Sequence, residues 1–186
     1  VHNHFPAWRN YREYCNGPLA DIGAHHFDIG QWAMDADDTG PVKILPPEEG
    51  ESELKLIYAN GVEVIHGRDP EWKGGTIFYG TEGTIWVDRG PWKSDPESLI
   101  KEYEASVTLR QPRNHHEDWL DCIHSGEMPM AHAEAGHRTA SICQLCNIGY
   151  ELRRVLTWDP KKEVFVGDKE ANKLTDRKRR KKWYRV

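Results

Sequence analysis

Alternating apolar and polar positions predict strands through the middle of the chain. Residues 53–67 (ELKLIYANGVEVIHG) contain two alternating runs that flank Asn60-Gly61, a dipeptide that favours the tight turn of a β-hairpin. Two further β-branched and aromatic runs, at 76–80 and 84–88, flank a second Gly-containing turn. Shorter runs predict strands at 42–45 and 103–109, whereas 91–99 (PWKSDPESL) reads as a loop.

Helical spacing of apolar residues appears on both sides of these strands. The helices are expected from Gly17 to about Met34, from Asn114 onwards, and over 133–155, with a short strand and a last helix after them. Pro18 suits the first turn of the first helix. This order predicts an α+β fold, with a predominantly antiparallel open sheet and helices on one face.

We expect a single α+β domain over residues 1–186, in which 1–16 form an aromatic entry loop and 175–186 a basic tail. No Gly-rich turn joins a predicted strand to a helix, and no βαβ unit is apparent. A Rossmann domain is therefore not expected within this chain, and no cofactor-binding residue is assigned.

Charge, hydropathy and cysteine content argue against several kinds of partner and site. Seven of the 25 Lys and Arg residues fall in the last ten positions, so the rest of the chain, with all 30 Asp and Glu, is strongly acidic. We expect no nucleic-acid partner, and the absence of a long apolar run predicts no membrane span. Cys143 and Cys146 form a CxxC inside a helical pattern, which favours buried thiols over a redox or zinc site.

The first predicted helix carries the carboxylates and imidazoles that are the main candidates for acid–base or metal-binding roles. Asp21, His25, Asp28 and Trp32 are spaced to share one face, and His26 adds a second imidazole. The face suits an acid–base site, but it also suits a solvated stripe on a surface helix. A zinc or manganese site closed by two further histidines is a third possibility. Adjacent histidines cannot both face one ion on a regular helix, so no metal ligand is assigned.

GPLADIGAHHFDIGQW, residues 17–32, resembles the G-x-x-x-D-x-G-x-H-x-x-D helix of the Gfo/Idh/MocA oxidoreductases. Further pieces follow in that family's order and extend the resemblance over nearly the whole chain: FYGTEGTIWVDRG, NHHEDWLDCI, EAGHRTASICQLCNIGYELRR and WDPKKEVFVGDKEAN. The late pieces are similar to a bacterial subgroup that handles complex carbohydrates.

The resemblance implies a C-terminal domain that normally follows a Rossmann domain. That partner domain would bind NAD or NADP and supply a catalytic Lys, because this chain has no Glu-Lys-Pro type motif. The implied substrates are sugars, cyclitols or related polyols, and the implied chemistry is hydride transfer between a secondary alcohol and the nicotinamide. The free sheet face would make a homo-oligomer, and the compartment, cytoplasm or bacterial periplasm, stays open.

The resemblance also assigns roles to individual residues. His25 matches the active-site base and Asp21 its positioning partner, and an imidazole suits the removal of a hydroxyl proton near neutral pH. His26 and Asp28 receive supporting roles with the substrate.

An aromatic face beside polar groups is typical of a polyol pocket. On that argument His115, His116, Trp8 and Tyr11 are candidate substrate-binding residues, although a helix cap for the histidines and packing for the aromatics are alternatives.

The sequence therefore predicts the C-terminal domain of an NAD(P)-dependent sugar or polyol oxidoreductase, inactive without its cofactor domain. Two other functions remain open. One is a stand-alone binding or assembly module without redox activity, and the other is a metal-dependent lyase or hydrolase acting on keto-sugars.

Overall fold

The computed structural model describes residues 7–72, 74–90, 92–101 and 114–177. These residues form two compact units. Unit 1 comprises Val1–Ala24, Thr39–Arg68 and Ala140–Val186, and unit 2 comprises His25–Asp38 and Asp69–Thr139. Each unit has its own antiparallel sheet. The single domain expected over 1–186 stays a prediction.

Unit 1 is built on a five-stranded sheet in the order β3-β2-β1-β7-β8, with every pair antiparallel. Its strands are β1 (Lys43–Leu45), β2 (Leu54–Ile57), β3 (Glu63–His66), β7 (Leu156–Asp159) and β8 (Val164–Phe165). The predicted hairpin is confirmed, because β2 pairs with β3 and Gly61 N donates to Tyr58 O at 3.0 Å. Gly61 has φ +88°, a conformation that favours glycine.

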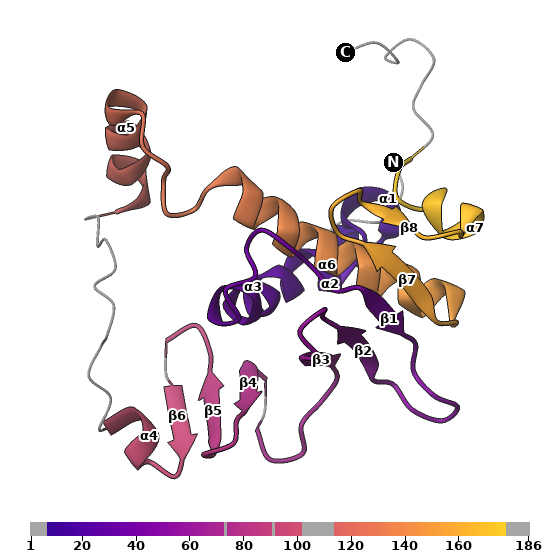
Figure 1. Ribbon diagram of the computed structural model, residues 1–186, viewed down its shortest axis with the longest axis horizontal. Coiled ribbons are helices and arrows are strands. Elements are labelled where there is room, and N and C mark those ends of the chain that lie inside the picture. Colours follow the sequence, from indigo (N-terminus) through magenta and orange to yellow (C-terminus); the bar gives the residue numbers. More distant parts are fainter. Residues whose placement is uncertain (1–6, 73, 91, 102–113, 178–186) are drawn as a thin grey trace. The chain divides into compact units, whose positions relative to one another are not determined.

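The long helix α6 (Ala133–Leu152) covers one face of this sheet, and Figure 1 shows it beside β1 and β7. The buried hydrophobic residues of the α6 part of unit 1 are Ile142, Cys143, Leu145, Cys146 and Ile148. At Gly149 the helix comes so close that an added Cβ would lie 2.7 Å from Ile44 Cγ2 and 2.8 Å from Leu54 Cδ1. The core of unit 1 therefore depends on a small residue at this position.

Unit 2 holds a three-stranded antiparallel sheet in the order β4-β5-β6 (Figure 1), followed by α4 (Ser98–Lys101). The strands β4 (Thr76–Tyr79) and β5 (Thr84–Val87) confirm the second predicted pair. Strand β6 (Trp92–Asp95) contradicts the loop expected at 91–99. Its sequence, WKSD, has no apolar alternation, and it is a strand because it pairs with β5 along its length. The strand predicted at 103–109 lies outside the described residues.

Several helix boundaries differ from the sequence prediction. The helix expected from Gly17 to Met34 is two helices, α2 (Pro18–Asp21) and α3 (Gly23–Ala33), with Ile22 in a turn between them. The described part of the expected entry loop contains the 3-10 helix η1 (Ala7–Asn10) and the helix α1 (Arg12–Cys15). Helix α5 (His115–Ser125) begins one residue after the predicted start, with Asn114 as its N-cap.

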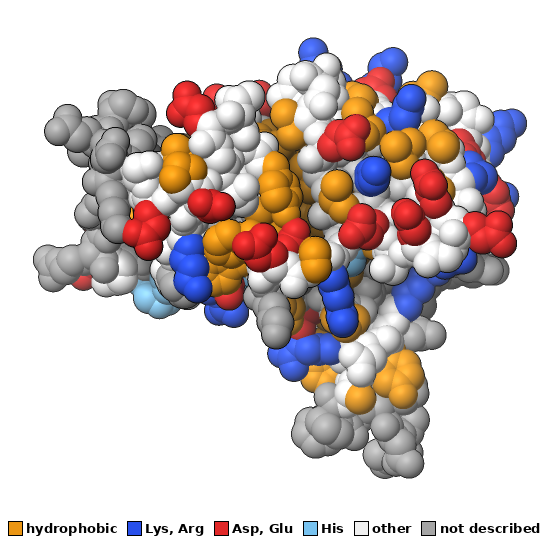
Figure 2. Space-filling view, turned by 90° about the horizontal axis from the view of Figure 1, so that it is seen from below, with side chains coloured by type: hydrophobic (Ala, Val, Ile, Leu, Met, Phe, Trp, Pro, Cys, Tyr) orange, Lys and Arg blue, Asp and Glu red, His pale blue; other side chains and the backbone are white. Residues whose placement is uncertain are grey.

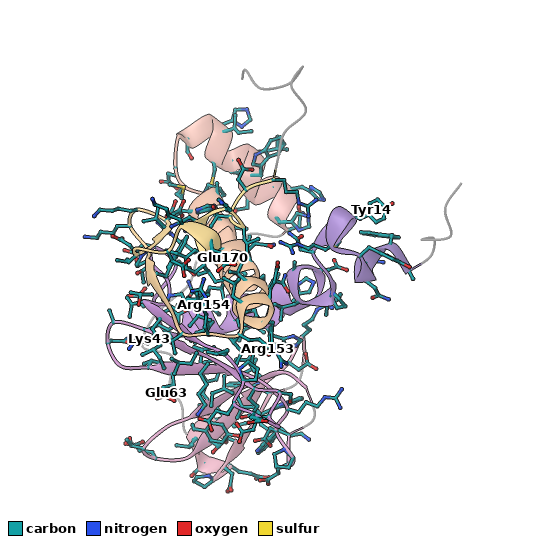
Figure 3. All side chains as sticks on the ribbon, turned by 90° about the vertical axis from the view of Figure 1, so that its right-hand side faces the viewer. Tyr14, Lys43, Glu63, Arg153, Arg154 and Glu170 are labelled. Carbon is teal, nitrogen blue, oxygen red and sulfur yellow. The ribbon has the colours of Figure 1, made fainter. Side chains whose placement is uncertain are left out.

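The C-terminal end of unit 1 is held by charged and polar contacts. Helix α7 (Lys169–Asn172) has Asp168 as its N-cap, whose side chain accepts from Ala171 N at 3.0 Å. Arg154 forms an ion pair with Asp168 and, at 2.9 Å, with Glu170, and Figure 3 shows Arg154 and Glu170 close together.

The α+β class and the antiparallel pairing are confirmed, with the described strands divided between two sheets. On the face seen in Figure 2, acidic and basic side chains are interspersed. In the described part of the chain, no helix is both long and apolar enough to cross a membrane.

Candidate functional site

His25 lies in the first turn of α3 with its side chain exposed. Within the described ranges, the structure gives its ring no hydrogen-bond or ion-pair partner. An exposed imidazole with no partner among the described residues is accessible to a ligand.

Three contacts within unit 2 hold α3 in place. Thr76 Oγ1 in β4 donates to the backbone oxygen of His26 at 2.9 Å. The His26 ring places Nε2 3.3 Å from Asp88 Oδ1, directly after β5. On the next turn, Asp28 Oδ1 accepts from Thr139 Oγ1 at 3.0 Å. Strand β4, the residue after β5, and α6 therefore orient the helix that carries His25.

The Asp88 carboxylate is held ionised. Arg89 N donates to Asp88 Oδ1 at 2.7 Å, and this hydrogen bond, followed by the one from His26, lowers the pKa of Asp88. His26 thus has a charged partner within the chain. The substrate roles expected for His26 and Asp28 stay predictions, and each side chain makes a contact that supports α3.

Asp21 has a partner that the sequence did not indicate. In unit 1 its carboxylate forms an ion pair with Arg9 of η1, and the Arg9 guanidinium lies 4.5 Å from the centre of the Trp8 ring. Asp21 and the predicted substrate residue Trp8 are therefore linked through Arg9. Asp21 and Arg9 are 12 positions apart on separate short elements, so no helical or strand spacing could have revealed the pair.

The remaining candidate residues have identifiable neighbours. Tyr11 packs edge-on against Tyr14 with ring centres 6.2 Å apart. His115 and His116 are exposed at the start of α5, with ring centres 4.1 Å apart. Asn114 caps this helix, since its side chain accepts from the backbone N–H groups of His116 and Glu117, both at 3.0 Å. The cap is confirmed, and the substrate roles stay predictions.

Asp21 belongs to unit 1 and His25 to unit 2, so their predicted partnership also stays a prediction. Within the described ranges, no group of three His, Cys, Asp or Glu residues is arranged to hold a metal ion.

The CxxC of α6 consists of two buried free thiols, as predicted. Burial raises the pKa of Cys143 to about 11 and raises the pKa of Cys146 as well. Thiols of this kind are poor nucleophiles at neutral pH, because the reactive form is the thiolate.

Comparison with known proteins agrees with the fold. A family model described as "Oxidoreductase family, C-terminal alpha/beta domain", of the Gfo/Idh/MocA group, matches residues 1–185. Among solved structures, an NAD-binding protein from Listeria innocua is similar, with 12% sequence identity and a TM-score of 0.51. The match covers 81% of this chain and 54% of the Listeria chain, so this chain spans about half of that protein's length. No curated protein matches the sequence.

The match over residues 1–185 and the α+β fold with antiparallel sheets lead to the same conclusion: the chain belongs to the Gfo/Idh/MocA oxidoreductase family, as a C-terminal alpha/beta domain.

Proposed function

We propose that this chain is the substrate-handling part of a nicotinamide-dependent oxidoreductase that acts on a secondary hydroxyl of a sugar, cyclitol or related polyol. The observation that carries the proposal is the exposed His25, which has no partner among the described residues and lies on an anchored helix, in a chain that belongs to an oxidoreductase family. The family membership supplies the reaction class, and His25 supplies a group able to take part in it.

The chemistry requires removal of the hydroxyl proton as the alcohol carbon is oxidised. A neutral imidazole accepts that proton near physiological pH, and its charged form is readily hydrated at an exposed position. His26, Asp28 and Thr76 hold the helix, so the ring of His25 is attached to a fixed backbone. In this proposal His25 is the general base.

Asp21 is proposed as the positioning residue, and its ion pair with Arg9 determines how it can act on the substrate. A carboxylate paired with a guanidinium has acceptor capacity left for substrate hydroxyls. Trp8, whose ring lies against Arg9, would offer an apolar face to the sugar ring. Tyr11, His115 and His116 are proposed as further contacts with the substrate.

The described residues do not fit a dinucleotide. A dinucleotide cradle needs a strand, a Gly-rich turn and a helix N-terminus free to meet phosphate. Gly167 does lie between β8 and α7, but the next residue is Asp168, whose carboxylate already caps α7 and pairs with Arg154. NAD or NADP is therefore proposed to bind mainly to a Rossmann domain outside this chain.

The test is a comparison of His25→Gln with His124→Gln in the full oxidoreductase. His25→Gln is expected to lower kcat about 10²- to 10⁴-fold and to remove the acidic limb of the kcat/KM pH profile. Asp21→Asn should lower kcat less than His25→Gln does, because this change affects positioning and not the proton transfer itself. His124 is an exposed histidine on α5, and its substitution controls for the loss of an imidazole. An unchanged pH profile in His25→Gln would refute the base assignment.

A binding or assembly module without redox activity is the second candidate, favoured by the poor fit of the described residues to a dinucleotide. The two functions are separated by assaying the full protein with a panel of polyols and NAD or NADP. Reduction of the nicotinamide supports the oxidoreductase, and binding without reduction supports the module. In either case we propose a homo-oligomer through the sheet face, which light scattering would measure.

A further inference from the structure

Unit 1 contains a polar hollow that the proposed reaction does not use. Its volume is about 430 Å³, within the range of small-molecule sites. One wall is a face of α6, where Gln144, Asn147, Ile148 and Glu151 are spaced to point to the same side. The residues around the end of α1 and those after α7 complete it.

The carboxamides of the hollow are oriented by Asn16, which has left-handed backbone geometry at the end of α1. Asn16 Nδ2 donates to Gln144 Oε1 at 2.8 Å, and Asn147 Nδ2 donates to the Asn16 backbone oxygen at 2.9 Å. Arg177 donates to Asn16 Oδ1 at 2.6 Å. Each of the bonds to Gln144 and Asn147 uses one end of the carboxamide, the oxygen or the nitrogen, and so fixes which end is left free for a ligand.

The two carboxamide ends that remain free differ in kind: one donates hydrogen bonds and the other accepts them. Gln144 keeps its amide N–H groups and Asn147 keeps its side-chain oxygen, and no described residue supplies a partner for either. A donor and an acceptor thus lie three residues apart on one helix face. The buried Ile148 directly follows Asn147 in the sequence and forms an apolar part of the wall.

Charges of both signs line the hollow: the basic residues are Arg12, Lys173 and Arg177, and the acidic ones are Glu151 and Asp176. Arg12 forms an ion pair with Glu151 at 2.5 Å, and Asp176 accepts from the Arg177 backbone at 2.7 Å. The Arg12 charge therefore already has a carboxylate partner. A neutral ligand with adjacent donor and acceptor groups matches the free carboxamide ends.

We propose that this hollow binds a small neutral ligand through a pair of adjacent hydroxyl groups. One hydroxyl accepts from the Gln144 amide and its neighbour donates to Asn147 Oδ1. The proposal does not rest on the oxidoreductase reaction, since neither His25 nor Asp21 lines the hollow.

The test is a titration of ¹⁵N-labelled protein with myo-inositol, followed by backbone amide shifts. The expected result is saturable shifts concentrated at residues 144–148. Gln144→Glu keeps the acceptor for Asn16 and replaces the free donor by an oxygen, so it should weaken binding about tenfold. Asn60→Asp is the matched control, because it adds the same charge in the hairpin and keeps the acceptor for Val62 N.

The proposal would be overturned by the absence of saturable shifts with myo-inositol, or by shifts of the same residues with sodium acetate alone. Equal affinity in Gln144→Glu and wild type would also overturn it. His25→Gln should leave these shifts unchanged while turnover falls, so failure here and failure of the proposed reaction give different results.

Discussion

At the scale of single residues, we expect Gly→Ala substitutions at two positions of α6 to change the stability of the protein in opposite directions. Gly149→Ala should destabilise the protein by about 1–3 kcal/mol, since the added methyl group would overlap Ile44 and Leu54. Gly136→Ala is the matched control on the same helix, because nothing lies within 4 Å of its added Cβ. It should stabilise by about 0.5–1 kcal/mol through helix propensity. Urea denaturation of both variants measures the difference, and equal effects would contradict the close packing of α6.

His66 gives a second prediction at this scale. Its Nδ1 lies 2.6 Å from the Tyr150 hydroxyl, and burial lowers its pKa below 6.5. Below pH 6.5 the unfolded chain takes up this proton more readily than the folded protein does, so stability falls as the pH drops through 6.5 toward the folded pKa. Urea unfolding at pH 7.5 and 5.5 should show a smaller loss in His66→Gln than in wild type. An identical loss would show that His66 does not carry the effect.

At the scale of elements, the cap of α7 predicts a graded loss. Asp168 supplies both the cap to Ala171 N and the charge paired with Arg154. Asp168→Asn keeps an acceptor and loses the charge, whereas Asp168→Ala loses both, so the urea midpoint should fall further for Ala.

The Arg154 guanidinium lowers the pKa of Asp168 to about 2. The stabilisation is therefore present above pH 3.8 and is lost as the pH falls through about 2. The difference in stability between wild type and Asp168→Asn, which isolates the charge, should shrink over that range, and a difference that stays unchanged at pH 2 would rule out the charge.

Helices and strands could be predicted from the sequence where the pattern that specifies them involves residues close together in the chain. Asn60-Gly61 specifies its hairpin and Asn114 specifies the start of α5, because turn and cap chemistry involve neighbouring residues. β6 was not predictable, because its strand structure comes from pairing with β5. The same limit applies to the candidate site. The sequence indicated Asp21 and His25, but Arg9 and Asp88 became evident only through contacts distant in the chain.

At the scale of the whole molecule, the proposed division of labour predicts that residues 1–186 alone do not bind NADH or NADPH. Both described sheets are antiparallel, and the carboxylate of Asp168 occupies the helix start that follows Gly167. Titration of the isolated chain with NADH and NADPH should leave the nicotinamide fluorescence unchanged, whereas a protein that also carries a Rossmann domain should enhance or quench it. Saturable binding by the isolated chain would contradict the proposal that the cofactor depends on another domain. It would mean that these antiparallel sheets and short helices hold a dinucleotide without a Gly-rich turn.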